Sequence, residues 1–136
     1  MGKLTLSDEA VRALFSEEGW PCERLGEGMW RSHFRGRKGR FPVLIRHDPA
    51  GYVTFAIVPF LKSPQDQGVA AVLYQRLMQL NHGLLMAKFC IDDDLDVVLS
   101  AEYPTAHLDR SEFRDALDVI SFYADQHLAE LQALVG

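Results

Sequence analysis

The residues of this sequence with the greatest potential for chemistry are two histidines and a cysteine. His33 and His47 fall in neighbouring predicted strands, where they could face each other beside Asp48, and Cys90 lies in a later predicted strand. An enzyme built on these side chains needs a base within hydrogen-bond reach of a nucleophile. No Gly-x-Ser-x-Gly nucleophile elbow or other catalytic motif accompanies them. We therefore predict that the protein is not an enzyme and has no catalytic residue. The alternative is a site that the fold assembles from His33, His47 and Cys90.

An aspartate-rich stretch is the main candidate for metal binding. Residues 92–96 contain four aspartates, and carboxylates are the usual ligands of calcium. An EF-hand loop beginning at Asp92 also needs glycine at its sixth position and glutamate at its twelfth, which are Val97 and Tyr103 here. The two cysteines of the chain are too few for a zinc site or a disulfide framework. We predict a solvated hairpin turn at residues 92–96, no metal and no cofactor.

The turn at residues 35–40 combines positive charge with aromatic neighbours. Its basic side chains are Arg35, Arg37, Lys38 and Arg40, and the aromatic residues around them are Trp30, Phe34 and Phe41. Single-stranded nucleic acid is bound by this combination because phosphates meet cations and bases stack on rings. The same cations could instead contact an acidic protein segment or the acidic end of a second copy. The turn is too short for a phosphate-binding loop and does not open a helix.

Charge is distributed unevenly along the 136-residue chain, whose formal net charge is −5. Between residues 24 and 46, seven basic residues and one acid give a local charge of +6. Residues 92–130 hold eleven acids and two bases, a local charge of −9. Such a separation concerns the partners of a protein rather than its fold. The length fits a single domain, 1–136, and 48% hydrophobic with 24% charged residues is ordinary for a globular protein.

The sequence carries no sign of a membrane or of export. No apolar run approaches the roughly 20 residues that a membrane span needs. The N-terminal residues lack the apolar core of a signal peptide. We predict a cytoplasmic protein that does not contact a membrane.

Hydrophobic periodicity predicts three helices and five strands. The helices are expected at residues 5–18, at residues 68–80 and from Asp109 towards the C-terminus, where Asp109 and Glu112 have capping-box spacing. The strands are expected at residues 29–35, 41–47, 52–58, 85–91 and 97–101. The strand at 52–58 is apolar on both faces, as a strand buried on two sides would be. Pro59 and Pro64 are expected to bracket a turn after it.

Short turns between consecutive strands make them antiparallel. The element order α-βββ-α-ββ-α therefore predicts an α+β fold, an antiparallel sheet packed with helices.

The chain resembles the YbjN-like family, whose fold is that of the type III secretion chaperones. The most specific stretch is Leu77-Met78-Gln79-Leu80-Asn81, followed by Lys88-Phe89-Cys90-Ile91-Asp92, which matches the family's helix end and following strand. An early helix that leaves through Gly19-Trp20 also looks like the family's first helix. The resemblance covers essentially the whole chain and implies a small, cytosolic, often dimeric protein without enzymatic activity. Members are described as sensory-transduction or stress-related regulators of bacteria, and the secretion chaperones bind an extended segment of a client protein.

From these features we predict a protein-binding adaptor or chaperone-like regulatory module that acts as a homodimer and binds a segment of a partner protein. The alternative is a single-stranded nucleic acid binder that uses the basic turn 35–40. The residues expected to bind the partner are Trp30, Arg31, Phe34, Arg35, Arg37, Arg40 and Leu44.

Overall fold

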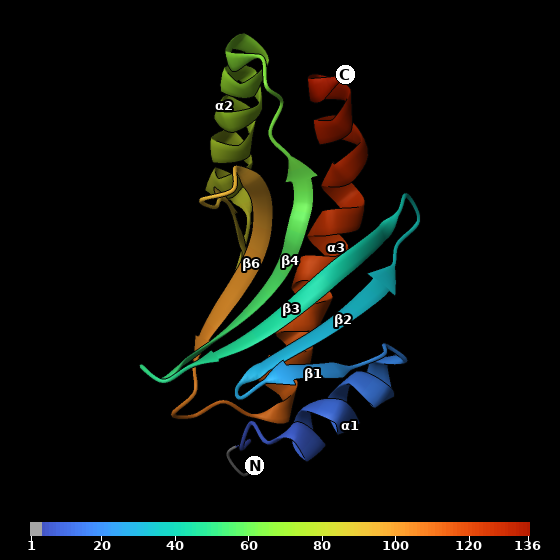
Figure 1. The fold of residues 1–136 in the computed structure, drawn as a ribbon, viewed down its shortest axis with the longest axis vertical. Coiled ribbons are helices and arrows are strands. Elements are labelled where there is room, and N and C mark those ends of the chain that lie inside the picture. The colour runs from blue at the N-terminus through green and yellow to red at the C-terminus, as the bar shows by residue number, and fades with distance from the viewer. Residues whose placement is uncertain (1–3) are drawn as a thin grey trace.

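A six-stranded antiparallel sheet with helices packed on one face forms the computed structural model, which describes residues 4–136 (Figure 1). The helices are α1 (Asp8–Glu18), α2 (Gln67–Gly83) and α3 (Arg110–Val135). The strands are β1 (Glu23–Gly26), β2 (Met29–Arg35), β3 (Arg40–Asp48), β4 (Tyr52–Lys62), β5 (Lys88–Ile91) and β6 (Asp96–Pro104). They lie in the order β1-β2-β3-β4-β6-β5, so the predicted antiparallel α+β architecture is confirmed. The N-terminal residues 1–3, part of the segment inspected for a signal peptide, lie outside the described residues.

Alternation along β2 and β3 shows how the sheet is divided into a helix-covered face and an open face. In β2, Trp30, Ser32 and Phe34 are buried, whereas Arg31 and Arg35 are exposed. In β3, Phe41, Val43 and Ile45 are buried in the same way. Successive side chains of a strand point to opposite faces, so each strand gives its apolar set to the helices. Figure 1 shows α3 behind β2 and β3, with the open face towards the viewer.

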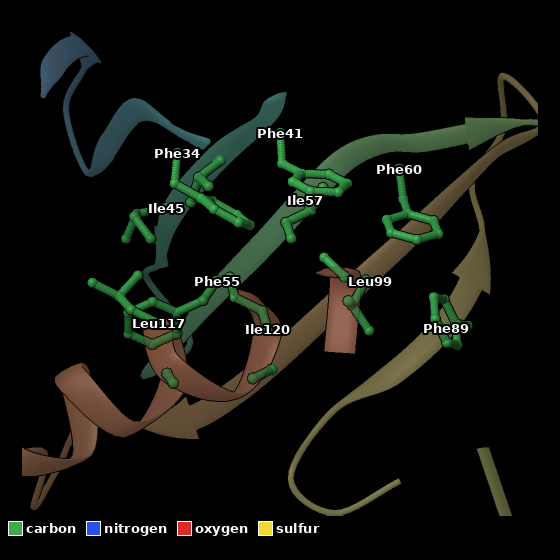
Figure 2. Close-up of a cluster of buried hydrophobic side chains, with 14 of the residues drawn as sticks. Phe34, Phe41, Ile45, Phe55, Ile57, Phe60, Phe89, Leu99, Leu117 and Ile120 are labelled. Carbon is green, nitrogen blue, oxygen red and sulfur yellow. The ribbon is translucent and has the colours of Figure 1, made fainter. Parts of the chain in front are cut away.

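The core lies between the sheet and the three helices. Figure 2 shows aromatic and aliphatic side chains from β2, β3, β4, β5 and β6 gathered against Leu117 and Ile120 of α3. The rings of Phe34 and Phe41 stack at 5.0 Å between centroids, and Phe55 meets Phe113 edge-on at 4.9 Å. These separations are within the favourable range for aromatic pairs, so ring packing adds to the gain from apolar burial.

Helix ends follow the capping rules, with one shift from the sequence expectation. Asp109 and Glu112 form the predicted capping box at the start of α3, and Gly19 ends α1 with φ 74°. Glycine adopts this left-handed conformation without the steric cost of a Cβ. The first helix, however, is capped by Ser7 and begins at Asp8, three residues later than expected, because the Ser7 hydroxyl accepts the N–H of Ala10 (3.1 Å).

The structure differs from the predicted strands at β1, β4 and β5, and also at β6, which ends at Pro104 rather than at residue 101. Strand β1 was not predicted, because all four of its residues are exposed and carry no alternation. Strand β4 does not end before Pro59 but continues to Lys62, with a register shift between Ile57 and Leu61. Such an irregularity tolerates a residue without an N–H, so Pro59 does not produce the expected turn.

The third difference is the late start of β5. It begins at Lys88 rather than at residue 85, because Met86 has φ 67° and leaves the extended conformation. The Asn81 side chain then bonds both the N–H (2.7 Å) and the C=O (2.9 Å) of Phe89. The end of α2 therefore holds the strand that follows it.

The aspartate stretch folds as a tight turn between β5 and β6, as predicted. One oxygen of Asp92, Oδ1, accepts the backbone N–H groups of Asp94 (3.0 Å) and Asp96 (2.9 Å). These are the local side-chain bonds by which aspartate favours turns.

Candidate partner-binding surface

The side chains on the open face of the sheet form the candidate site, which we call the open sheet face. It consists of the outward residues of five strands: Arg31, His33, Arg35, Arg40, Pro42, Leu44, Arg46, Thr54, Ala56, Val58, Lys88, Cys90, Val98, Ser100 and Glu102. Strand pairing places Leu44 opposite Ala56, and Ala56 opposite Ser100, so apolar and small side chains adjoin in the middle. An apolar strip that no helix of the described chain covers is available to a partner.

A hollow of about 360 Å³, which we call the apolar hollow, lies at the centre of the open sheet face. Its apolar lining comes from Leu44, Ala56, Val58 and Val98, and Arg46, Lys88 and Glu102 are among its polar lining. All lining residues belong to strands or to the turn after β5. The hollow exists because alanine and serine occupy central positions where neighbouring strands carry longer side chains.

A second hollow of about 500 Å³, the basic hollow, adjoins it towards β1. Arg31, His33 and Arg40 line it, together with Cys22, Glu23 and Pro42. The two hollows meet where Arg31 of β2 pairs with Leu44 of β3. A ligand lying across the sheet can therefore contact both.

Ion pairing differs between the two sides of the open sheet face. On the side of β4, β6 and β5, Lys88 pairs with Glu102 (2.8 Å), and Lys62 at the end of β4 pairs with Asp96 of β6 (3.7 Å). On β2 and β3, Arg31 pairs with Glu23 (2.7 Å). Among the described residues, the remaining arginines of that side have no carboxylate within 4.0 Å; they are Arg35, Arg40 and Arg46. Arg40 instead lies against the ring of His33, with its Nη2 3.0 Å from Nε2. The β2–β3 side thus carries positive charge that the chain does not neutralise.

The predicted partner-binding residues do not all reach one surface. Arg31, Arg35, Arg40 and Leu44 lie on the open sheet face. Trp30 and Phe34, however, point to the opposite face and are 2% and 7% exposed. Contrary to the prediction, Trp30 and Phe34 therefore cannot bind a partner together with Leu44. Trp30 pairs with the buried Ile45, whose neighbour Leu44 points to the other face of the sheet.

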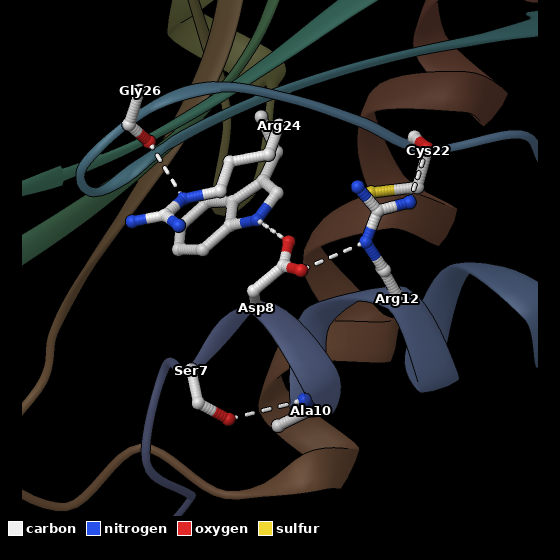
Figure 3. A network of polar contacts seen from close by, with 8 residues as sticks. Ser7, Asp8, Ala10, Arg12, Cys22, Arg24 and Gly26 are labelled. Carbon is white, nitrogen blue, oxygen red and sulfur yellow. Dashed lines mark hydrogen bonds and ion pairs between the residues drawn. The ribbon is translucent and has the colours of Figure 1, made fainter.

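Trp30 serves the packing of α1 on the sheet instead. Its Nε1 donates to Asp8 Oδ1 (2.9 Å), and Arg12 Nε donates to the other oxygen of Asp8 (2.9 Å) (Figure 3). The hydrogen bond from Trp30, followed by that from Arg12, lowers the pKa of Asp8 below its usual 3.8. Arg12 also donates to the carbonyl of Cys22 (2.9 Å), which fixes the segment leading into β1.

Arg37, also predicted to contact a partner, is held by α3. The backbone N–H of Arg37 donates to Asp125 Oδ1 (2.7 Å), and its Nε donates to Oδ2 (2.8 Å). The side chain of Asp125 is only 19% exposed, because the β2–β3 turn packs on it. Gly36 permits this approach, since a Cβ there would lie 2.7 Å from Asp125 Oδ1.

Replacing Asp125 with alanine should loosen the β2–β3 turn and lower the free energy of unfolding by about 1 kcal/mol, because two hydrogen bonds are lost. The hydrogen bond from the Arg37 side chain lowers the pKa of Asp125 below its usual 3.8. The stability that the ionised Asp125 contributes is therefore fully present above pH 3.8 and is lost as the pH falls through the lower pKa of the folded state. Urea denaturation of the unsubstituted protein and of Asp125→Ala at neutral pH and near pH 2 measures the two free energies of unfolding. The difference between these free energies should be smaller at the lower pH. Asp118→Ala, an exposed aspartate of the same helix, should change stability by less than about 0.5 kcal/mol. Equal losses of stability in Asp125→Ala and Asp118→Ala would contradict the inference that Asp125 holds the β2–β3 turn.

The structure does not bring His33, His47 and Cys90 together. His33 pairs with Pro42 and His47 pairs with Val53, so the two histidines do not face each other. Cys90 lies on β5, four strands from His33 in the sheet order, which corresponds to roughly 19 Å. Desolvation by the surrounding side chains raises the pKa of Cys90, and burial likewise raises that of Cys22. Both thiols are therefore protonated near neutral pH and are poor nucleophiles.

Two further features are absent from residues 4–136. No group of three or more His, Cys, Asp or Glu side chains is arranged to hold a metal ion. No helix combines the length and the apolar character that crossing a membrane requires.

Of the residues that line the apolar hollow, only Leu44 was among those predicted to bind the partner. The apolar character of both faces of 52–58 pointed to Ala56 and Val58. Val98 and Ser100 had no such signal, because only the pairing of β4 with β6 places them beside Ala56. The unpaired state of Arg46 was likewise visible only once its neighbours were known.

Several solved structures share this fold. A chain of the heterodimeric ExoU–SpcU complex from the type III secretion system of Pseudomonas aeruginosa matches with a TM-score of 0.62 and 19% identity, over 92% of this chain and 97% of that chain. A chain of the ExsC–ExsE complex matches with a TM-score of 0.64 and 16% identity, over 94% and 97%. YbjN from E. coli matches with a TM-score of 0.65 and 15% identity, over 95% and 96%. No curated protein is similar enough in sequence to count as a relative.

These similarities define the class of fold as that of the type III secretion chaperones. Residues 7–133 match the model of the YbjN family, described as "Putative bacterial sensory transduction regulator". The chain belongs to the YbjN family, as the motifs around Asn81 and Lys88 predicted.

Proposed function

We propose that the protein is a non-enzymatic, chaperone-like adaptor of the bacterial cytoplasm that binds a segment of a partner protein on its open sheet face. The observation that carries this proposal is the apolar hollow, since Leu44, Ala56, Val58 and Val98 line a concave surface that no described helix covers. Extended segments bind to such surfaces because their alternate side chains enter apolar pockets. A regulatory role fits the family description, and we propose a role in stress response as the alternative, which the identity of the partner would test.

The structural neighbours support a binding role. ExoU–SpcU is a heterodimeric complex and ExsC–ExsE is a complex of two differently named proteins. Their chains share the fold of this protein over more than 90% of its length. A fold that holds partners in those cases is a suitable scaffold for a partner here, although a fold alone does not determine function.

We further propose that the protein forms a homodimer through an apolar surface on its helix side. The connection between α2 and β5 exposes Leu85 (72%) and Met86 (54%), and Met78 near the end of α2 is 70% exposed. The hydroxyl of Tyr123 accepts the N–H of Leu85 (3.0 Å), which places this connection against α3. Large exposed apolar side chains in one region are typical of an interface.

Leu85→Glu should convert the dimer to a monomer, because a carboxylate at the centre of an apolar interface loses its hydration without gaining a partner. Light scattering should give twice the 15.4 kDa chain mass for the original protein and the single mass for the variant. Leu25→Glu, on the exposed strand β1, is the matched control and should remain dimeric. A monomeric original protein would refute the homodimer but not the adaptor role.

Single-stranded nucleic acid binding is the second candidate. Lys38, Arg35 and Arg40 remain exposed around the β2–β3 turn and could contact phosphates. The observation against it is the burial of Trp30 and Phe34, which removes the rings on which bases would stack.

Affinity capture from cells, analysed by mass spectrometry with and without nuclease, tests the proposal. We expect a specific protein that is retained after nuclease treatment. A partner lost on nuclease treatment would favour the nucleic acid alternative, and recovery of no protein at all would contradict the adaptor role.

A further inference from the structure

Two features of the open sheet face lie side by side and restrict the chemistry of its ligand. The apolar hollow takes small or branched apolar side chains, and the basic hollow beside it is lined by arginines. They share a border at the pair Arg31–Leu44. A single ligand that fits both must therefore carry apolar and negatively charged groups close together.

The charges of the open sheet face indicate the sign of the charge on that ligand. On the β2–β3 side, four arginines and their neighbour Glu23 carry a net charge of +3. Arg46 is the most informative of them, because it lines the apolar hollow and has no carboxylate within 4.0 Å among the described residues. On the other side, the lysines are already paired with Glu102 and Asp96. A ligand thus gains charge pairing on one side only, and that pairing requires acidic groups.

The lining of the hollows favours protein over nucleic acid. The floor between Leu44 and Val98 consists of aliphatic and small side chains, and no Phe, Tyr or Trp side chain lines either hollow. The apolar hollow thus offers bases no large ring on which to stack, and the carboxylates of Glu102 and Asp92 at its far side repel a polyanion. Alternate side chains of an extended segment point the same way. A segment with acidic residues at alternate positions of one half and aliphatic residues at alternate positions of the other half therefore satisfies both hollows.

We propose that the open sheet face binds an acidic, aliphatic segment of the partner protein in extended conformation, with its carboxylates at Arg46, Arg40 and Arg31 and its aliphatic side chains in the apolar hollow. This inference rests on the proposed adaptor function and names the partner chemistry of the same site. Six strands spaced by about 4.8 Å give the sheet a width of roughly 24 Å, which about seven residues of extended chain can cross.

The test measures binding of fluorescein-labelled peptides of about ten residues to the full-length protein by fluorescence anisotropy. The first probe has glutamates at alternate positions of one half and valines at alternate positions of the other half, with serines between them; we call it the Glu–Val peptide. The others are the corresponding Lys–Val and Glu–Ser peptides and an oligothymidylate of about ten nucleotides. We expect the Glu–Val peptide to bind at least about tenfold more tightly than each of the others, and its affinity to fall as salt rises from about 50 to 300 mM.

Arg46→Glu should weaken binding of the Glu–Val peptide at least about tenfold, because it reverses an unpaired charge at the edge of the apolar hollow. Lys38→Glu is the matched control: it makes the same change in net charge at the exposed β2–β3 turn and should change the affinity less than about twofold. Circular dichroism of both variants checks that they remain folded.

Three results would overturn the inference. They are equal binding of Glu–Val and Lys–Val, tighter binding of the oligothymidylate, and no Glu–Val binding together with an Arg46→Glu variant that changes from dimer to monomer. The last result would show that the open sheet face binds a second copy of this chain. If these peptides fail while affinity capture still recovers a protein partner, the adaptor role stands and only the stated chemistry of its ligand is wrong.

Discussion

Trp30→Ala should lower the free energy of unfolding by about 3–5 kcal/mol, the usual cost of removing a large aromatic side chain from a core. Trp30 is 2% exposed, and its Nε1 donates to Asp8 in the first turn of α1. The substitution therefore leaves a cavity under β2 and also removes a bond that attaches α1 to the sheet. Denaturant unfolding followed by circular dichroism measures the loss directly.

Two further variants separate the causes of that loss. Trp30→Phe keeps most of the ring volume but loses the hydrogen bond to Asp8, so about 1–2 kcal/mol should be lost. Arg31→Ala, the neighbouring outward residue, should cost less than about 1 kcal/mol, because its ion pair with Glu23 is exposed. If Trp30→Ala left stability unchanged but abolished partner binding, Trp30 would belong to a binding surface after all.

Ala56→Tyr should reduce the affinity for the partner protein at least about tenfold while leaving the protein folded. Ala56 lies between Leu44 and Ser100 in the middle of the open sheet face, and its Cβ points away from the core. A tyrosine there fills the apolar hollow, whose volume is about 360 Å³. A tenfold loss of affinity corresponds to about 1.4 kcal/mol of binding free energy. Blocking a pocket at the centre of an interface commonly costs at least this much.

The stability of Ala56→Tyr should stay within about 1 kcal/mol, because tyrosine suits strands and the new side chain lies on the open face. Ala129→Tyr, on the exposed side of α3, adds the same group elsewhere and should leave partner affinity unchanged. Surface plasmon resonance with the captured partner compares the two variants. Unchanged binding by Ala56→Tyr would show that the partner does not use the hollow.

Much of the fold could be predicted from local patterns. The alternation in residues 29–35 correctly placed Trp30 and Phe34 opposite Arg31 and Arg35, and the Asp109–Glu112 spacing marked the start of α3. These features depend on residues close in sequence. Strand β1 escaped prediction because it is an exposed edge without a hydrophobic pattern. The continuation of β4 past Pro59 depends on an irregularity in its pairing with β6.

The candidate site was less predictable because it depends on strand order. Alternation separated Trp30 from Arg31, but the choice of the face that the helices cover required the tertiary structure. Because Trp30 is buried in the core, the candidate binding surface lies on the opposite face of the sheet, where Leu44 adjoins Ala56. The pairing of Arg37 with Asp125 joins residues 88 positions apart and leaves no local signal. The basic segment and the apolar strand were both visible in the sequence, but their shared surface was not.

The most direct test of the adaptor role on the open sheet face is site-specific photo-crosslinking in cells. A benzophenone amino acid is introduced at Leu44, in the apolar hollow, or at Val72, which is 52% exposed on α2. After irradiation, cross-linked proteins are identified by mass spectrometry. We predict a cross-link from position 44 to a partner protein, at a segment rich in acidic and aliphatic residues, and no cross-link to that partner from position 72. A partner that cross-links from position 72 and not from position 44 would contradict the proposed role of the open sheet face.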